Sequence, residues 1–336
     1  MKSPTAFTIV EKNIDKELIG SKKTYIAVDK LQKRYAALHL KKEKGYVNGP
    51  PLTYRIKEEY YDSIQQGEFI HNDIKDFGKL LKDIALSSNN TTSQTEKAQL
   101  ESMFLEAIQY FLDQGWQAGA SGSTRHHIGY AIRDFTEAVF IMRHALKSDK
   151  SLKPIGESLQ WLYNLGMVLD NEENFHVNID YLNTQAYYHL MLIFLTDNKE
   201  KQSALLSTYS NYTSIILAQE DQEWGFKIDG TSWHHNGHYP AYGMGAFTNT
   251  PRIIYALSQT KYRIREAGHK NFKKAFLTTG KYSKLYDYGF GNAGRHPLED
   301  GNIKSLKSKF LLMAYSGNPE NTLEIDPDVA SAYLRL

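Results

Sequence analysis

The sequence contains no cysteine in its 336 residues, and this absence excludes disulfides, thiolate metal sites and a cysteine nucleophile. No run of residues approaches the roughly 20 apolar positions that a membrane-spanning helix needs. The charge is also balanced, because 40 Lys and Arg face 38 Asp and Glu for a net charge of +2. Such a balance gives no general attraction to nucleic acid or to an anionic membrane. We therefore expect neither as a partner, and an acidic ligand must be bound by local clusters.

The start of the chain lacks the pattern of a secretory signal peptide. One Lys near the amino end is not followed by an apolar stretch of about 7–15 residues. The sequence therefore predicts either a protein that stays inside the cell or a chain whose natural start is missing.

Aromatic residues, by contrast, are plentiful. They make up 12% of the chain and include 23 Tyr and 4 Trp. Their rings combine an apolar face with a polar tip, which suits stacking on sugar rings. We expect most of them to be packing residues and a few to contact a ligand.

From Ser93 onward, apolar side chains recur three or four residues apart, as on one face of a helix. Pro154 stands where a first-turn proline would open a helix, and Asn198 separates two of the periodic segments. Successive amphipathic helices with short polar connections are typical of antiparallel hairpins. We therefore predict an all-α fold, an (α/α) incomplete toroid of such hairpins over 93–336. The predicted helices cover 100–111, 135–146, 155–169, 182–194, 205–216, 249–260 and 265–280.

The first 92 residues show weaker periodicity. A charged stretch at 41–44 is typical of a solvated segment, and Gly49-Pro50-Pro51 indicates a turn. The polar run at 87–93 is predicted to be a loop that ends in a helix N-cap at Ser93. We interpret 1–92 as an irregular segment that leads into the toroid.

Three clusters combine polar and aromatic side chains. The segment 224–243 holds three His, two Trp, two Tyr and four Gly, a composition that disfavours a helix and predicts a functional loop. A second cluster, at 125–130, is predicted to precede the second helix. The third, at 294–297, follows the last predicted helix.

These clusters resemble the motifs of polysaccharide lyase family eight, and most closely those of its chondroitin ABC lyases. In that subgroup Asp-Gly-Thr-x-Trp-x-His-x-Gly-x-Tyr-Pro-x-Tyr is followed by Ala-Gly-Arg-His-Pro, and this sequence has both, at 229–242 and 293–297. An upstream His-His-x-Gly-Tyr matches at 126–130. The resemblance implies an (α/α) toroid that β-sandwich domains normally follow. Those β domains are absent from this chain, so we expect a truncated or single-domain form whose catalytic Glu must come from a missing β domain.

The resemblance also implies cleavage of a 4-linked uronide by β-elimination, which needs a group that removes the C5 proton and an acid for O4. Tyr242 is the predicted proton-transfer residue, since a nearby cation can lower a phenol pKa of about 10. Arg295 is the predicted cation, because its guanidinium stays charged and offers several donors. His235 matches the family histidine that takes the C5 proton in iduronate, and an imidazole with a pKa of about 6.5 suits a base.

The substrate carboxylate must be partly neutralised by preorganised donors before C5 becomes acidic. The resemblance assigns this work to His127, or alternatively to His126. His234 and Asn236 stand where the relatives carry an arginine and an acidic residue, so these departures are expected to alter sulfate preference. The remaining candidates for substrate contact are Tyr130, Trp233 and His296, with Trp116 and Trp224 as candidates for sugar subsites.

Other chemistries stay open at this point. His235 and His238, with His234 and Asp229, form an alternative zinc site. The sequence lacks an accompanying His-Glu-x-x-His helix, so we predict no metal. A carboxylate-pair glycoside hydrolase on the same toroid and a non-catalytic polysaccharide-binding fragment are the alternative functions.

The resemblance further implies which molecules the chain acts on or needs. The implied substrate is an acidic glycosaminoglycan, chondroitin or dermatan sulfate, with hyaluronan as a further candidate. No cofactor is expected to be required, although a dependence on a divalent cation, Ca or Mg, is open. The implied location is periplasmic or secreted.

Overall fold

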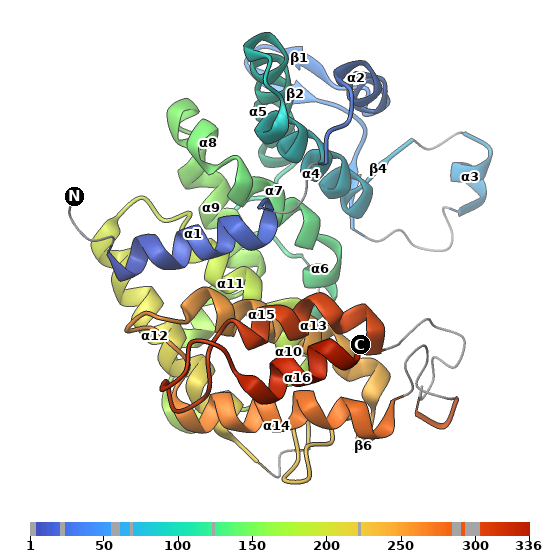
Figure 1. Ribbon diagram of the computed structural model, residues 1–336. Helices are drawn as coiled ribbons and strands as arrows, with labels where there is room; N and C mark the ends of the chain where they lie inside the picture. Colours follow the sequence, from blue (N-terminus) through green and yellow to red (C-terminus); the bar gives the residue numbers. More distant parts are fainter. Residues whose placement is uncertain are drawn as a thin grey trace. The chain divides into compact units, whose positions relative to one another are not determined.

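The computed structural model describes residues 5–20, 24–54, 61–67, 70–122, 125–220, 223–283, 290–292 and 303–336. Helices dominate these residues (Figure 1), and the strands that occur among them form short two-stranded sheets. The predicted all-α class is confirmed. Within the described ranges, no helix has the length and apolar character needed to cross a membrane.

The chain divides into two compact units. The first unit comprises Met1–Glu17, Met167–Leu190 and Ser203–Leu336, and the second comprises Leu18–Gly166 and Met191–Gln202. None of the boundaries between these units falls near residue 92. The start of a catalytic domain at residue 93 stays a prediction.

The core of the second unit contains phenylalanine rings in contact from three helices. Phe77 of α4 (Ile74–Asn90) lies 5.7 Å from Phe135 of α7 (Arg133–Ile141), and Phe111 of α5 (Gln94–Asp113) lies 4.6 Å from the same ring, centroid to centroid. A Cβ on Gly78 would stand 3.0 Å from the Phe135 backbone nitrogen, so this glycine lets α4 and α7 approach closely. The packing of amphipathic helices through their apolar faces, as the periodicity predicted, is therefore present.

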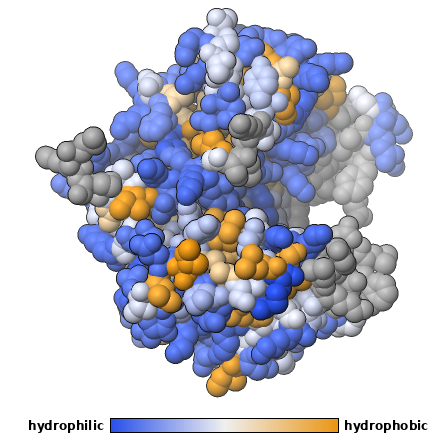
Figure 2. Space-filling model, viewed as in Figure 1, coloured by the Kyte–Doolittle hydropathy of each residue, from blue (hydrophilic) through white to orange (hydrophobic). Residues whose placement is uncertain are grey.

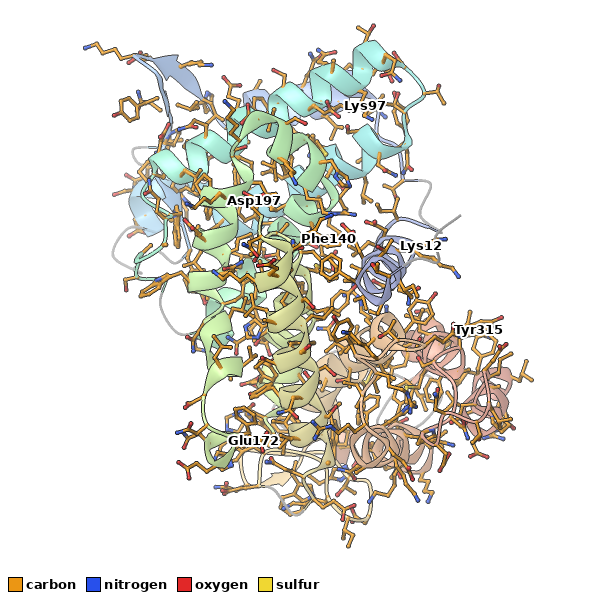
Figure 3. All side chains as sticks on the ribbon, turned by 90° about the vertical axis from the view of Figure 1, so that its left-hand side faces the viewer. Lys12, Lys97, Phe140, Glu172, Asp197 and Tyr315 are labelled. Atoms are coloured by element: carbon orange, nitrogen blue, oxygen red, sulfur yellow. The ribbon has the colours of Figure 1, made fainter. Side chains whose placement is uncertain are left out.

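Several smaller elements complete the second unit. They are α2 (Val28–Ala36), β1 (Lys41–Glu43), β2 (Tyr46–Asn48), β3 (Leu52–Thr53), α3 (Tyr61–Gln65), β4 (Asn72–Asp73), α6 (Arg125–Ala131), α8 (Arg143–Asp149) and α9 (Leu152–Leu162). β1 pairs antiparallel with β2, and β3 pairs parallel with β4. Figure 3 labels Phe140 of α7, which is fully buried, and Lys97 and Asp197, which are exposed.

The sequence prediction for the start of the chain needs correction. The described residues before 92 contain α1 (Ala6–Leu18), α2 and α4, so this segment is more helical than expected. The predicted polar loop at 87–93 is helical as far as Asn90. Its Ser87 is buried, and the Ser87 hydroxyl accepts a hydrogen bond from the Ile26 N–H at 3.0 Å, so a polar residue here serves packing within the fold. The N-cap prediction is confirmed, since Ser93 accepts a hydrogen bond from the Glu96 N–H at 3.3 Å.

Other predicted helices differ in their limits. The helix expected over 155–169 ends at Leu162, and a 3-10 turn, η2 (Leu165–Leu169), follows it. The helix expected over 182–194 is divided at Gln185 into α10 (Ile179–Thr184) and α11 (Ala186–Ile193), where the backbone leaves the helical region. The remaining long helices are α12 (Lys199–Ala218), α13 (Pro240–Leu257) and α14 (Glu266–Tyr282), and 3-10 turns occur at η3 (Glu172–Asn174) and η4 (Phe290–Asn292).

A row of aromatic rings forms the core of the first unit. Phe226 contacts Phe247 of α13 at 5.6 Å, Phe272 and Phe276 of α14 stack at 5.6 Å, and Phe276 stacks on Phe310 at 4.0 Å. Phe310 belongs to α15 (Lys307–Ala314), which follows η5 (Ile303–Leu306) and packs against both α13 and α16 (Pro327–Arg335). This row fixes the segment around Phe226 to α13, α14 and α15.

Apolar side chains also reach the surface of the first unit. Figure 2 shows them gathered over α15, α16 and the loop between these helices. The exposed members are Leu311, Tyr315, Leu323, Ile325 and Leu334.

Candidate functional site

A short hairpin in the first unit carries the histidine cluster. β5 (Trp233–His234) pairs antiparallel with β6 (Gly237–His238), so that His234 lies opposite Gly237. The two linking residues, His235 and Asn236, both have positive φ, at 50° and 64°. Positive φ at both central positions is the requirement of a type I′ turn, and Asn and His tolerate this region better than most residues. The turn leaves His235 exposed at the tip of the hairpin.

The Asp-Gly-Thr part of the motif is a structural turn that supports this hairpin. Asp229 accepts hydrogen bonds from the Thr231 hydroxyl at 2.7 Å and the Thr231 N–H at 2.8 Å, and these bonds hold the pKa of Asp229 below its usual range. Thr231 in turn accepts a hydrogen bond from the Trp233 indole N–H at 2.9 Å. Gly230 has a φ of +84°, and a Cβ there would lie 2.4 Å from the Thr278 hydroxyl, so only glycine fits.

Helix α13 begins immediately after the hairpin and carries Tyr242 in its first turn. The Tyr239 N–H donates to the Ser232 carbonyl at 2.9 Å, and Pro240 occupies the first helical position, where its missing N–H costs nothing. The predicted loop therefore ends at Tyr239. The helical location gives Tyr242 a more rigid backbone than a loop would.

Helix α13 lies unusually close to α10 at this point. A Cβ on Gly245 would stand 2.0 Å from the Asn183 amide carbon, and the Asn249 side chain donates to the Asn183 carbonyl at 2.5 Å. These contacts hold the end of α10 against the second and third turns of α13.

The polar centre of the site joins Tyr242, Asp180 and His234. The Tyr242 hydroxyl donates to Asp180 Oδ2 at 3.1 Å, and His234 Nε2 lies 3.5 Å from the same oxygen. The His234 ring stacks on the Tyr242 ring, with centroids 4.2 Å apart and planes 29° apart. The His234 side chain is 3% exposed and that of Asp180 is 14% exposed. A largely buried carboxylate and imidazole therefore hold a half-buried phenol.

His235 lies beside this centre. Its ring centroid is 5.5 Å from that of Tyr242 and 4.2 Å from that of His234. The Trp224 ring packs edge-on against His234 and His235, at 4.7 and 5.7 Å, and its carbonyl accepts the Ile179 N–H at the start of α10. The structure thus brings together the two predicted proton-transfer residues, whose roles stay predictions.

His238 points to a different neighbour. Its ring meets Tyr282 edge-on at 4.8 Å, and burial lowers the pKa of His238, with the nearby Asp229 acting in the opposite sense. Burial also raises the pKa of Tyr282. Among the residues that the structure describes, no three or more His, Asp and Glu side chains are placed to hold a metal ion. The zinc alternative gains no support from these residues.

The remaining predicted residues lie elsewhere in the chain. His126, His127 and Tyr130 are on α6 of the second unit, inside a helix that the sequence analysis expected to begin later. His127 is exposed, and the Arg133 guanidinium lies 5.0 Å from the Tyr130 ring centroid. Because these residues belong to the other unit, their participation in one site with Tyr242 stays a prediction. Arg295 and His296 lie outside the described residues.

The tryptophans differ in their exposure and in the hydrogen bonds that their indole N–H groups donate. Trp116 donates its indole N–H to the Leu52 carbonyl at 3.1 Å and stacks on Phe111 at 6.0 Å, which favours the packing role. Trp233 uses its N–H within the hairpin turn, and the Lys227 ammonium lies 4.9 Å from its ring centroid. Trp161, which was not among the predicted residues, is 56% exposed.

Asp180 is the site residue that sequence reasoning missed. The preceding Asn178 accepts the Asp180 N–H at 2.7 Å as the N-cap of α10. An Asn-x-Asp pattern at a helix start signals an N-terminus and an acidic first turn. It does not reveal a hydrogen bond to a tyrosine 62 positions further along the chain.

The sequence matches a known protein family over almost its whole length and is similar to two lyases of one organism. The family model described as "Lyase, catalytic" matches residues 5–336. The chain is 30% identical over 302 residues to the chondroitin sulfate ABC exolyase of Proteus vulgaris, which covers 87% of this chain and 30% of that protein. It is 33% identical over 253 residues to the chondroitin sulfate ABC endolyase of the same organism, covering 72% of this chain and 24% of that protein. The chain thus spans less than a third of the length of these relatives.

Two solved structures share the fold. A xanthan lyase of Paenibacillus superposes with a TM-score of 0.60 at 14% identity, covering 98% of this chain and 30% of that chain. A chondroitin AC lyase variant of Streptomyces coelicolor A3 gives a TM-score of 0.61 at 7% identity, covering 98% of this chain and 44% of that chain. These likenesses confirm the predicted helical toroid class.

Proposed function

The chain belongs to the family of lyase catalytic domains, and from this premise we propose that it cleaves uronic-acid-containing polysaccharides by β-elimination. The proposed substrates are chondroitin and dermatan sulfates, with hyaluronan as a further candidate. The observation that carries the proposal is the proximity of two side chains in a family of lyase domains. The half-buried Tyr242 phenol lies beside the exposed His235 imidazole.

The proposed reaction needs no water. A base removes the C5 proton of the uronate, the electron pair forms the double bond between C4 and C5, and the bond from C4 to O4 breaks. O4 then takes a proton and leaves as a hydroxyl. Positioned acids and bases of this kind contribute roughly 100- to 10,000-fold each to a rate.

The two residues are assigned by the face of the sugar that they reach. In glucuronate the C5 hydrogen and O4 lie on the same face, so Tyr242 as phenolate takes the proton and returns it to O4. In iduronate the C5 hydrogen lies on the opposite face, so His235 takes it while Tyr242 protonates O4. Arg295, by family resemblance, is the cation that favours the phenolate.

Further parts of the proposal concern what the chain needs. The relatives are more than three times as long as the matched segment, which supports a catalytic Glu supplied by a β domain outside this sequence. We propose that no resident cofactor is required, so exhaustive chelation should leave the rate unchanged. A loss restored by Ca or Mg would instead support the divalent-cation dependence. The proposed location is periplasmic or secreted, which fractionation of the source cells would test.

The direct experiment follows two product signals at once. The chain, alone and joined to a relative's β domain, is incubated with chondroitin and dermatan sulfates. New reducing ends and the ultraviolet absorbance of the conjugated unsaturated uronate should rise together. Reducing ends without this absorbance would favour the hydrolase, and binding without either signal would favour the non-catalytic fragment.

A further inference from the structure

We propose that Asp180, together with His234, is a positioning residue for Tyr242, which fixes the direction of the phenol hydroxyl and keeps the phenol protonated in the free protein. The mechanistic value of this arrangement rests on the proposed function, because it matters only if Tyr242 transfers a proton. The arrangement itself can be tested without measuring activity.

The first support is geometric. Asp180 Oδ2 is within hydrogen-bond distance of the Tyr242 hydroxyl, at 3.1 Å, and 3.5 Å from His234 Nε2. The His234 ring covers one face of the Tyr242 ring. A phenol held by a hydrogen bond at its tip and by stacking on its face has little freedom to rotate.

The second support is the rigidity of the segment that carries Asp180. Its N–H donates to the Asn178 side chain at 2.7 Å, and its carbonyl accepts the Thr184 hydroxyl at 2.7 Å. The close contact between Gly245 and Asn183 fixes α10 against α13 one turn further along. The carboxylate therefore has a preorganised position relative to Tyr242.

The third support is the burial of His234, which the sequence analysis predicted to contact substrate. A side chain that is 3% exposed, stacked beneath a tyrosine and placed against a carboxylate is better suited to hold those two groups than to bind a sugar. In this arrangement His234 restrains the Asp180 carboxylate from one side while Tyr242 engages it from the other.

The charged groups around Tyr242 affect how easily its phenol loses a proton, and this can be measured. Among the residues that the structure describes, the titratable groups that face Tyr242 include Asp180 from α10, His234 and His235 from the hairpin, and Tyr239 from the start of its own helix. A carboxylate beside a phenol disfavours the phenolate, because two negative charges would face each other. Removing the Asp180 charge should therefore make the phenolate easier to form.

The activity-independent test uses tyrosine labelled with carbon-13 at the ring carbon that bears the hydroxyl. The Tyr242 signal is assigned by its loss in Tyr242→Phe and is followed as the pH is raised. In Asp180→Asn the midpoint of this titration should fall by about one pH unit. Asp170→Asn, which removes an exposed carboxylate upstream in the same unit, should leave the midpoint unchanged. An unchanged midpoint in folded Asp180→Asn overturns the proposal.

The kinetic test separates positioning from a general structural role. Asp180→Asn keeps an oxygen that can accept the phenol hydrogen bond, whereas Asp180→Ala does not. On dermatan sulfate, where Tyr242 acts as the acid, Asp180→Ala should lower kcat by about 100-fold with KM within about threefold. On the same substrate Asp180→Asn should recover most of the loss and shift the alkaline limb of the pH–rate profile to lower pH. Equal losses in both variants, or a change confined to KM, contradict the positioning role. A wild-type protein that forms no unsaturated product under any condition contradicts the proposed function, and the titration above still decides the position of Asp180.

Discussion

At the scale of single residues, Tyr242 and His235 have opposite environments. Tyr242 is half-buried in the first turn of a helix, with its hydroxyl engaged by Asp180. His235 is exposed at the tip of a two-residue turn in the left-handed region, a conformation that costs a non-glycine residue free energy and is often retained at functional sites. The proposed reaction on the two uronate epimers requires a positioned acid beside an accessible base, and the environments of Tyr242 and His235 suit these proposed roles.

Substitution of these two residues should separate the epimers. Tyr242→Phe should abolish cleavage of both chondroitin and dermatan sulfates, because O4 loses its acid in each case. His235→Ala should reduce dermatan cleavage by about 100-fold more than chondroitin cleavage, since only iduronate needs the second base. The measurement is kcat/KM on each substrate with the folded state verified by circular dichroism. Equal losses on both substrates would mean that His235 positions the sugar.

The proximity of these two residues could be predicted from the sequence, because both lie in one short motif with turn-forming residues between them. The partner of Tyr242 could not be predicted, since Asp180 approaches it through the packing of α10 on α13. The burial of His234 could not be predicted either, because the direction of a side chain in a hairpin depends on the strand register, which the sequence does not reveal.

At the scale of elements, the contact between α10 and α13 holds the site together. Gly245→Ala would place a Cβ 2.0 Å from the Asn183 side chain, so the buried amide must move. We expect a loss of about 1–3 kcal/mol in the free energy of unfolding, together with a lower kcat. Gly237→Ala is the matched control, because a Cβ there meets nothing within 4 Å and its φ is not positive. Similar melting temperatures for both variants and wild type would contradict the close approach.

Helix α1 is held in the first unit by a buried charge cluster. Glu17 lies 2.8 Å from Arg252 and 3.1 Å from Lys309, and it accepts the Tyr187 hydroxyl at 3.0 Å. Burial acts to raise the pKa of Glu17, but the two cations outweigh it and lower that pKa to about 2. Replacing the carboxylate by an amide removes the buried negative charge that both cations share.

Glu17→Gln should therefore destabilise the fold by about 3–5 kcal/mol. The measurement is urea unfolding near neutral pH. Lys12→Gln, on the same helix and exposed (Figure 3), is the control and should stay within about 0.5 kcal/mol of wild type. A loss no larger than that of the control would mean that α1 is held by its apolar face alone.

Periodicity in the sequence predicted that helices are present, but it did not predict the residues at which they begin and end. Val10 and Ile14 show the same spacing in α1 as the later helices, and both are fully buried, yet the polar residues between them made the segment look irregular. The break at Gln185 has no proline or glycine beside it that would have predicted it from the sequence. Local pattern thus predicted the class of the fold, whereas packing decided where each helix ends.

At the scale of the whole molecule, acid should weaken the fold through His269. This side chain is buried, and burial, with Arg263 and Lys273 adding to it, lowers the pKa of His269 to about 4. The unfolded chain then binds a proton that the folded chain does not, so stability is full above about pH 6.5 and is lost as the pH falls toward 4. The loss should amount to roughly 3 kcal/mol in the free energy of unfolding.

The check is urea unfolding at a series of pH values between 7 and 4, compared with His269→Gln. The variant should show a weaker dependence on pH in this window, because it has no imidazole to protonate. Below about pH 4.5 both proteins should lose further stability as Glu17 takes up a proton in the unfolded state. Parallel pH profiles for the variant and wild type across the whole range would contradict the role of His269.

The central claim is that this chain eliminates and does not hydrolyse, and the mass of the product tests it most directly. Digestion of chondroitin sulfate in water enriched in oxygen-18 should give unsaturated oligosaccharides without solvent oxygen at the cleaved bond, each lighter by one water than the hydrolytic product. The signal should disappear in Tyr242→Phe. Saturated products that carry oxygen-18 would contradict the account.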